Sequence, residues 1–97
     1  MLTHVVLFKL KAFRPEQLST AKEKLLMLPG RVPQVRYLEV GTDLLHSERS
    51  YDLALITRFD SLADMQAYQL DPFHLEVAAY LKTICQSIIA VDYEGDL

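Results

Sequence analysis

The sequence is poor in cysteine and glycine, and both scarcities limit what the chain can be. Its 97 residues include one cysteine, Cys85, so no disulfide can form within the chain. This usage favours a reducing, cytoplasmic setting. With three glycines in all, the chain has no glycine-rich loop to cradle phosphate groups. Cys85 lies near the end of an expected helix, where a buried inert thiol is favoured over a nucleophile.

Excess positive charge and long apolar runs are lacking too. The ten basic residues are scattered and the formal net charge is −3, so we expect neither nucleic acid nor a charged membrane as partner. No apolar run approaches the roughly 20 residues that span a bilayer. Met1 to His4 shows no features of a secretory signal. The three histidines lack an i, i+4 spacing, and we expect no metal and no cofactor.

Hydrophobic residues are abundant, at 51% of the chain. This is a high value for a small soluble domain, and the length predicts one domain over residues 1–97. Alternating apolar residues predict strands over residues 4–11, 35–40, 51–59 and 87–93. Apolar residues at three- and four-residue spacing predict a helix that starts around Pro15 and ends at Pro29-Gly30. A second helix is expected from Ser61 to Leu70 and a third from Pro72 onward.

This order of strand, helix, strand, strand, broken helix and strand predicts an α+β fold. It matches the ferredoxin-like arrangement, a four-stranded antiparallel sheet with helices on one face. The opposite face is apolar instead of polar, because it carries Val5, Leu7, Ala54, Ile56 and either Ile88–Ala90 or Ile89–Val91. Two helical segments cannot cover both faces. We therefore expect a homodimer in which two copies pack sheet to sheet into a barrel.

The segment from Tyr68 to His74 combines a phenol, a carboxylate, a proline and an imidazole. On one unbroken helix Tyr68 and His74 would point about 120° apart. Pro72 disfavours a helical conformation at Asp71, and Asp71 is itself a good N-cap. The helix should therefore break at this point, and the corner can turn both polar side chains into one pocket.

The sequence resembles the family of stress-responsive dimeric α/β-barrel (Dabb) domains. The resemblance rests on His4-Val5-Val6-Leu7-Phe8-Lys9, Gly41-Thr42-Asp43, Tyr51-Asp52-Leu53-Ala54, Phe59-Asp60-Ser61, the corner from Ala67 to His74, and Val91-Asp92-Tyr93. These pieces span essentially the whole domain. The resemblance implies a ferredoxin-like fold that dimerises into a barrel, and a small cytoplasmic stress-responsive protein.

One plant branch of that family, olivetolic acid cyclase, closes a polyketide chain by an aldol condensation without a cofactor. The resemblance places its catalytic tyrosine and histidine on Tyr68 and His74, and its pocket histidine on His4. The plant branch has another histidine where this chain has Leu53, so the pocket expected here is more apolar. Its lining would comprise His4, Val6, Phe8, Leu53, Leu55 and Phe73.

Three interpretations of these residues stay open. The leading one is a pocket for a hydrophobic or carbonyl-containing small molecule. The second is a cofactor-independent lyase or cyclase, in which His74 acts as general base and Tyr68 donates a hydrogen bond to the enolate oxygen. The third is purely structural: Tyr68 packs, His74 binds backbone at the helix start, and His4 is a hydrogen-bonded core residue. His46, in a polar loop, is expected to be a surface residue.

Overall fold

The computed structural model describes residues 1–95, which form eight helices and strands. In chain order these are β1 (Leu2–Leu10), α1 (Pro15–Leu26), α2 (Leu28–Arg31), β2 (Tyr37–Thr42), β3 (Leu53–Phe59), α3 (Leu62–Leu70), α4 (Pro72–Ile84) and β4 (Cys85–Glu94). Asp96 and Leu97, which belong to the expected domain, lie outside the described residues.

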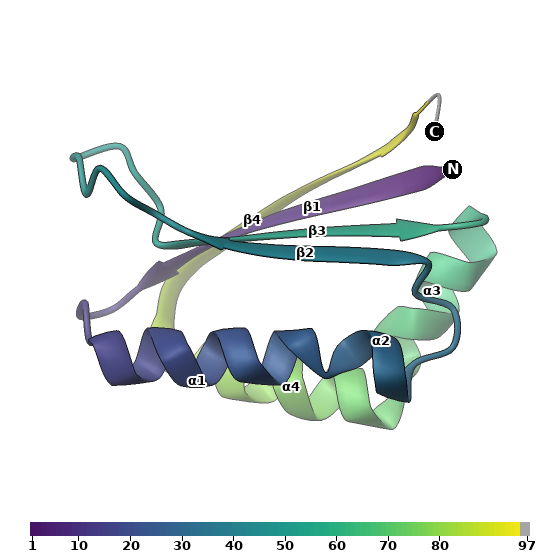
Figure 1. Cartoon of the computed structure of the whole chain (residues 1–97), viewed down its shortest axis with the longest axis horizontal. Helices are drawn as coiled ribbons and strands as arrows, with labels where there is room; N and C mark the ends of the chain where they lie inside the picture. Colours follow the sequence, from purple (N-terminus) through teal and green to yellow (C-terminus); the bar gives the residue numbers. More distant parts are fainter. Residues whose placement is uncertain (96–97) are drawn as a thin grey trace.

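The strands form one antiparallel sheet in the order β2-β3-β1-β4. Figure 1 shows the helices on one side of this sheet, with α1 and α4 running beneath it. The predicted ferredoxin-like fold is therefore confirmed. β1 pairs with both β3 and β4, so the first strand and the last strand of the described chain are neighbours.

The core fills the space between the sheet and the helices. It contains Leu2, Val6, Phe8, Leu10, Ala21, Leu25, Leu28, Val32, Leu53, Leu55, Phe59, Met65, Tyr68, Val77, Leu81, Ile84 and Cys85. Alternate residues of β1 and β3 enter this core, as their period of two requires. The opposite sheet face carries the apolar group that the alternation predicts, since Val5 pairs with Ile56 and Val91, and Leu7 with Ala54 and Ile89. The register thus selects Ile89 and Val91 over Ile88 and Ala90.

Several element boundaries differ from those that the sequence predicts. The turn at Pro29-Gly30 does not end the helical region, because Pro29 occupies the first turn of the short helix α2, where its missing N–H costs nothing. β3 begins at Leu53 instead of Tyr51. Asp52 is held from two sides, as its N–H donates to the Phe8 carbonyl at 2.9 Å and its carboxylate accepts from the Leu10 N–H at 2.8 Å.

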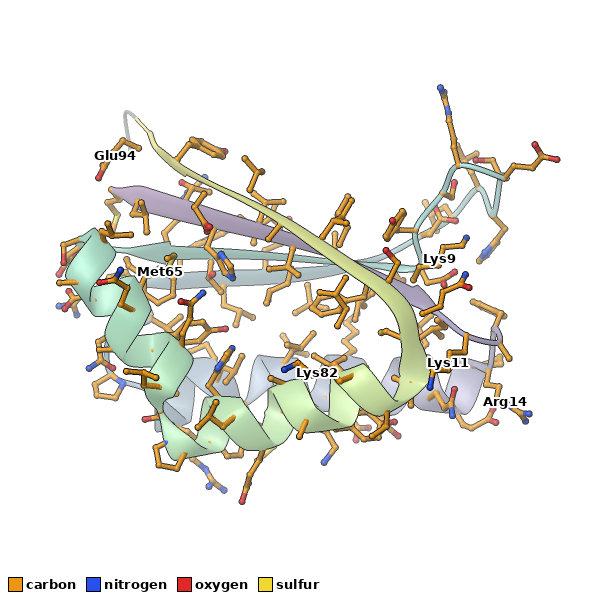
Figure 2. The ribbon with its side chains drawn as sticks, turned by 180° about the vertical axis from the view of Figure 1, so that it is seen from behind. Lys9, Lys11, Arg14, Met65, Lys82 and Glu94 are labelled. Atoms are coloured by element: carbon orange, nitrogen blue, oxygen red, sulfur yellow. The ribbon has the colours of Figure 1, made fainter. Side chains whose placement is uncertain are left out.

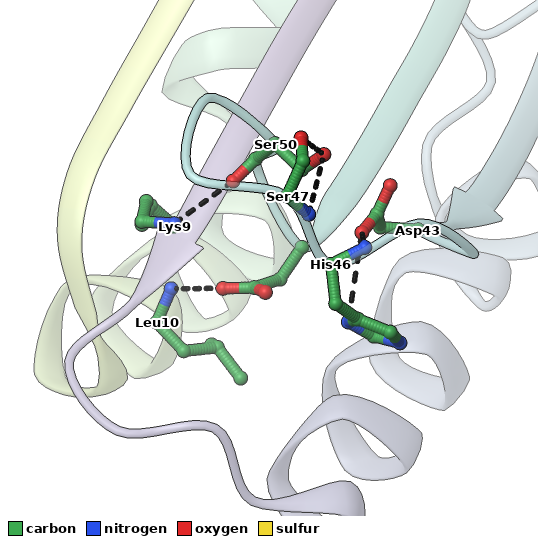
Figure 3. A network of polar contacts seen from close by, with 7 residues as sticks. Lys9, Leu10, Asp43, His46, Ser47 and Ser50 are labelled. Atoms are coloured by element: carbon green, nitrogen blue, oxygen red, sulfur yellow. Dashed lines mark hydrogen bonds and ion pairs between the residues drawn. The ribbon is translucent and has the colours of Figure 1, made fainter.

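The loop between β2 and β3 is tied to the end of β1, as Figure 3 shows. Lys9 Nζ donates to the Ser50 carbonyl at 2.8 Å, and the His46 N–H donates to Asp43 Oδ2 at 2.6 Å. The His46 side chain is exposed and its ring packs edge-on against Phe13. His46 therefore lies on the surface, as expected for a residue in a polar loop.

Candidate functional site

The corner between α3 and α4 has the capping that the sequence predicts. Ser61 Oγ accepts from the Asp64 N–H at 3.1 Å and starts α3. Asp71, with φ −61° and ψ 133°, ends α3 and caps α4, where its carboxylate accepts from the Phe73 N–H at 2.8 Å. The extended conformation of Asp71 redirects the chain, so that Tyr68 and His74 face each other with ring centroids 4.2 Å apart.

Tyr68 is deeply buried at this corner. Its side chain is among the largest that are fully buried, and its ring also packs on Phe59 at 4.9 Å. Among residues 1–95 its hydroxyl has no hydrogen-bond partner. Burial raises the pKa of Tyr68, so the phenol stays protonated and remains a hydrogen-bond donor. A buried donor without a partner costs free energy, which a ligand that carries an acceptor could recover.

His74 is fixed by the carbonyl that the helix break leaves open. Its Nδ1 lies 3.3 Å from the Gln69 carbonyl oxygen. A carbonyl only accepts hydrogen bonds, so Nδ1 carries the proton and Nε2 is the basic nitrogen. Desolvation lowers the pKa of His74 from its ordinary value of 6.5, and this outweighs the opposing effect of the Gln69 hydrogen bond. The imidazole is therefore neutral at pH 7 and has a free lone pair.

His4 is the second histidine of the site. It is buried on β1, and its Nδ1 donates to Oδ1 of Asp92, which lies opposite it on β4. Its ring meets the Tyr68 ring edge-on, with centroids 6.4 Å apart. Asp92 thus orients the imidazole, and the Nε2 atom of His4 is left for another partner.

These three rings lie in the wall of a cavity of about 200 Å³ between the sheet and α4. The wall also contains Val6, Phe8, Leu25, Leu55, Gln69, Val77, Ala78, Leu81, Lys82, Ile88 and Ala90. Its floor is buried, while Lys82, Ile88 and Ala90 are exposed and mark the mouth. The volume equals that of roughly seven water molecules, which suits a small ligand.

The cavity wall includes His4, Val6, Phe8 and Leu55 from the expected pocket, together with Tyr68 and His74. Leu53 and Phe73 lie elsewhere. Leu53 pairs with Thr42 at the start of β3 and packs in the core with 2% of its surface exposed. Phe73 is covered by the Arg31 guanidinium, 4.8 Å from its ring. The sequence pattern places both on the correct face, but it does not give their distance from the corner.

The site contains other residues that the sequence patterns above do not assign to it. Asp92 could have been found, because pairing the two terminal strands antiparallel places it opposite His4. His74, Ala78 and Lys82 recur every four residues and so form one stripe along α4. That stripe faces β4, and the small side chain of Ala78 leaves room for the cavity.

The described residues offer neither a metal-binding cluster nor a membrane-spanning helix. Residues 1–95 contain no group of three or more His, Cys, Asp or Glu side chains that could hold a metal ion. No helix in this part of the chain is both long enough and apolar enough to cross a membrane.

The fold and the site define a class: a ferredoxin-like α+β domain with a tyrosine–histidine pair in a cavity between its sheet and helices. A family model described as the stress responsive A/B barrel domain, Dabb, matches residues 2–95. The chain therefore belongs to the Dabb family. No curated protein matches it.

Solved structures with the same fold agree with this assignment. A dimeric protein of unknown function from Bacteroides fragilis NCTC 9343 has a TM-score of 0.86 and 31% identity, over 97% of this chain and 95% of that one. A dimeric ferredoxin-like protein from Thermobifida fusca YX has a TM-score of 0.87 and 25% identity, over 97% and 90%. A hydroxynitrile lyase from Passiflora edulis has a TM-score of 0.86 and 22% identity, over 99% and 94%.

Proposed function

We propose that this protein binds a small carbonyl-containing hydrophobic molecule in the cavity beside Tyr68 and His74. The observation that carries the proposal is the buried Tyr68 hydroxyl, which has no partner among residues 1–95. A carbonyl oxygen in the cavity would accept its hydrogen bond and remove the cost of the unpaired donor. The apolar wall formed by Val6, Phe8 and Leu81 would bury the rest of the ligand.

The proposal includes a homodimer formed through the outer sheet face. Ile89 and Val91 are 46% and 55% exposed there, beside Val5 and Leu7. Burying about 800 Å² per partner, roughly 60% of it apolar, would give a gross driving force on the order of 20 kcal/mol. Association costs offset several kcal/mol of this. The Bacteroides and Thermobifida structures are described as dimeric, which supports the same assembly here. A cytoplasmic location, supported by the lone cysteine, completes the proposal.

Calorimetry with 2-octanone, a ketone with an unbranched apolar chain, tests the pocket. We expect saturable binding to the wild type, weakened severalfold by Tyr68→Phe. Tyr80→Phe is the matched control, since it removes a phenol hydroxyl from α4 that is not in the cavity wall. Absence of binding to the wild type, or equal binding to Tyr68→Phe, would contradict the proposal.

A cofactor-independent lyase or cyclase is the second candidate, and the geometry of His74 favours it. Its Nδ1–H is held by the Gln69 carbonyl, so Nε2 is available to accept a proton from the carbon next to a carbonyl. The Tyr68 O–H would donate a hydrogen bond to the enolate oxygen that forms as the carbon–hydrogen bond breaks. The Passiflora protein shows that a lyase can occupy this fold.

Hydrogen exchange separates binding from this chemistry. In deuterated water, a base at His74 would replace the α-hydrogens of bound 2-octanone with deuterium, which NMR detects. His74→Gln keeps a polar side chain but lacks the base, so exchange should fall to the rate without protein. Binding with no exchange above that rate in the wild type would leave the ligand-binding function and remove the enzymatic one.

A further inference from the structure

One cation stands at the mouth of the cavity, and the mechanism proposed above does not use it. Lys82 is the only lysine or arginine in the cavity wall, and no aspartate or glutamate lies in that wall among the described residues. Figure 2 shows Lys82 extending from α4 into the space beneath the sheet. Within residues 1–95, Lys82 has neither a hydrogen bond nor an ion pair to a protein side chain.

Lys82 and His74 both line the cavity from α4, and after desolvation the charge of Lys82 also helps to lower the pKa of His74. They are separated by two steps of four residues, so both project from one face of the helix. Eight residues correspond to a rise of about 12 Å. Ala78 lies between them, and the side chains of Leu81 and Ala90 supply apolar wall. The cavity therefore has polar rings at Tyr68 and His74, apolar side chains along its wall and one cation, Lys82, at its mouth.

We propose that the ligand is an amphipathic carboxylate, whose anionic group pairs with Lys82 while its carbonyl group meets Tyr68 and His74. This inference rests on the proposed function, because it assigns the second end of the same ligand. A carboxylate suits the site because Lys82 has no competing acid in the wall, and because the mouth stays open to water. The ligand would span less than the ~12 Å of helix rise between the two residues, because the long Lys82 side chain leans toward the N-terminus of α4.

A pair of ketones of matched shape tests the charge. 2-Octanone and 7-oxooctanoate share the methyl ketone and the chain. The other end of the chain is a methyl group in 2-octanone and a carboxylate in 7-oxooctanoate. We expect the wild type to bind 7-oxooctanoate about threefold to tenfold more tightly, as a partly exposed ion pair allows. The preference should shrink as salt is added.

Two variants locate the effect. Lys82→Gln should lose the preference and bind both ketones with similar affinity. Lys22→Gln removes the same charge from α1, away from the cavity wall, and should keep the preference. Circular dichroism confirms that both variants fold.

The outcomes distinguish the two proposals. If the wild type binds both ketones equally, or if Lys82→Gln keeps the preference, the carboxylate inference is wrong and the pocket remains. If neither ketone binds, the pocket proposal is wrong and the carboxylate inference falls with it.

Discussion

The rings of Tyr68 and His74 lie 4.2 Å apart, but their polar groups are in opposite situations. His74 Nδ1 bonds to the Gln69 carbonyl, whereas the Tyr68 hydroxyl has no partner among the described residues. One member of the pair is therefore held in place, and the other still offers its hydrogen bond.

Replacing Tyr68 separates the roles of its ring and its hydroxyl. We expect Tyr68→Phe to leave the free energy of unfolding unchanged or to raise it by up to about 1 kcal/mol, because the hydroxyl is buried unpaired. Tyr68→Ala should lower it by about 3–5 kcal/mol, since it opens a large cavity in the core. Urea denaturation measures both. A loss above 1 kcal/mol in Tyr68→Phe would mean that the hydroxyl makes a bond in the native protein.

His74 should make stability depend on pH in a defined direction. Burial lowers its pKa in the folded state, so the unfolded chain binds the proton more readily. The contribution of neutral His74 to stability is complete above the pKa of the unfolded chain, about 6.5. It is lost as the pH falls through the lower pKa of the folded state. We expect the curve of unfolding free energy against pH to be flatter for His74→Gln over this range. Parallel curves for the two proteins would contradict the shift.

The two N-caps of the broken helix provide a matched pair. Ser61→Ala and Asp71→Ala should each lower the unfolding free energy by about 1 kcal/mol, because each removes one capping hydrogen bond. Only Asp71→Ala should also weaken binding of 2-octanone, since Asp71 sets the start of the helix that carries His74. Equal ligand affinities in the two variants would show that the cap does not position the site.

His4 and Asp92 should matter more than a surface pair. The His4 side chain is 8% exposed and Asp92 is 37% exposed, against 55% and 51% for Arg36 and Asp60. We expect Asp92→Asn to cost about 1–2 kcal/mol, because a neutral amide oxygen is a weaker acceptor for the buried imidazole than a carboxylate. Asp60→Asn should cost less than about 1 kcal/mol. Denaturation curves that show the same loss for both variants would argue against an orienting role for Asp92.

Charge on the outer sheet face should prevent dimerisation. Leu7→Glu or Ile56→Lys would bury an unpaired charge between two sheets, which is costly. Leu26→Glu is the control, because Leu26 is a similarly apolar but exposed residue of α1 on the helical side. Light scattering over a dilution series should give a dimer for the wild type and the control, and a monomer for the first two variants. A folded wild-type monomer at high micromolar concentration would falsify the dimer.

The fold was more predictable than the site, for a physical reason. The alternation of apolar residues over 4–10 and 53–59 predicts on which face of the sheet each side chain lies. Pro72 predicts the helix break at Asp71. Both are local properties of the chain. The cavity depends on which strands become neighbours and how far along them a side chain lies. Leu53 and Phe73 therefore face the helices as the alternation predicts but lie outside the cavity wall, and no sequence pattern assigns Lys82 or Asp92 to the site.

The pairing of β1 with β4 also dictates the order in which the molecule can be completed during synthesis. His4 and Asp92 are 88 positions apart, and β4 is the last of the described elements to leave the ribosome. Until then β1 has an unpaired edge, and the wall formed by Ile88 and Ala90 is absent. Such distant pairings slow folding and expose strands to aggregation. A ligand that contacts both α4 and β4 binds only after β4 has paired, so it would favour the completed sheet over the open one.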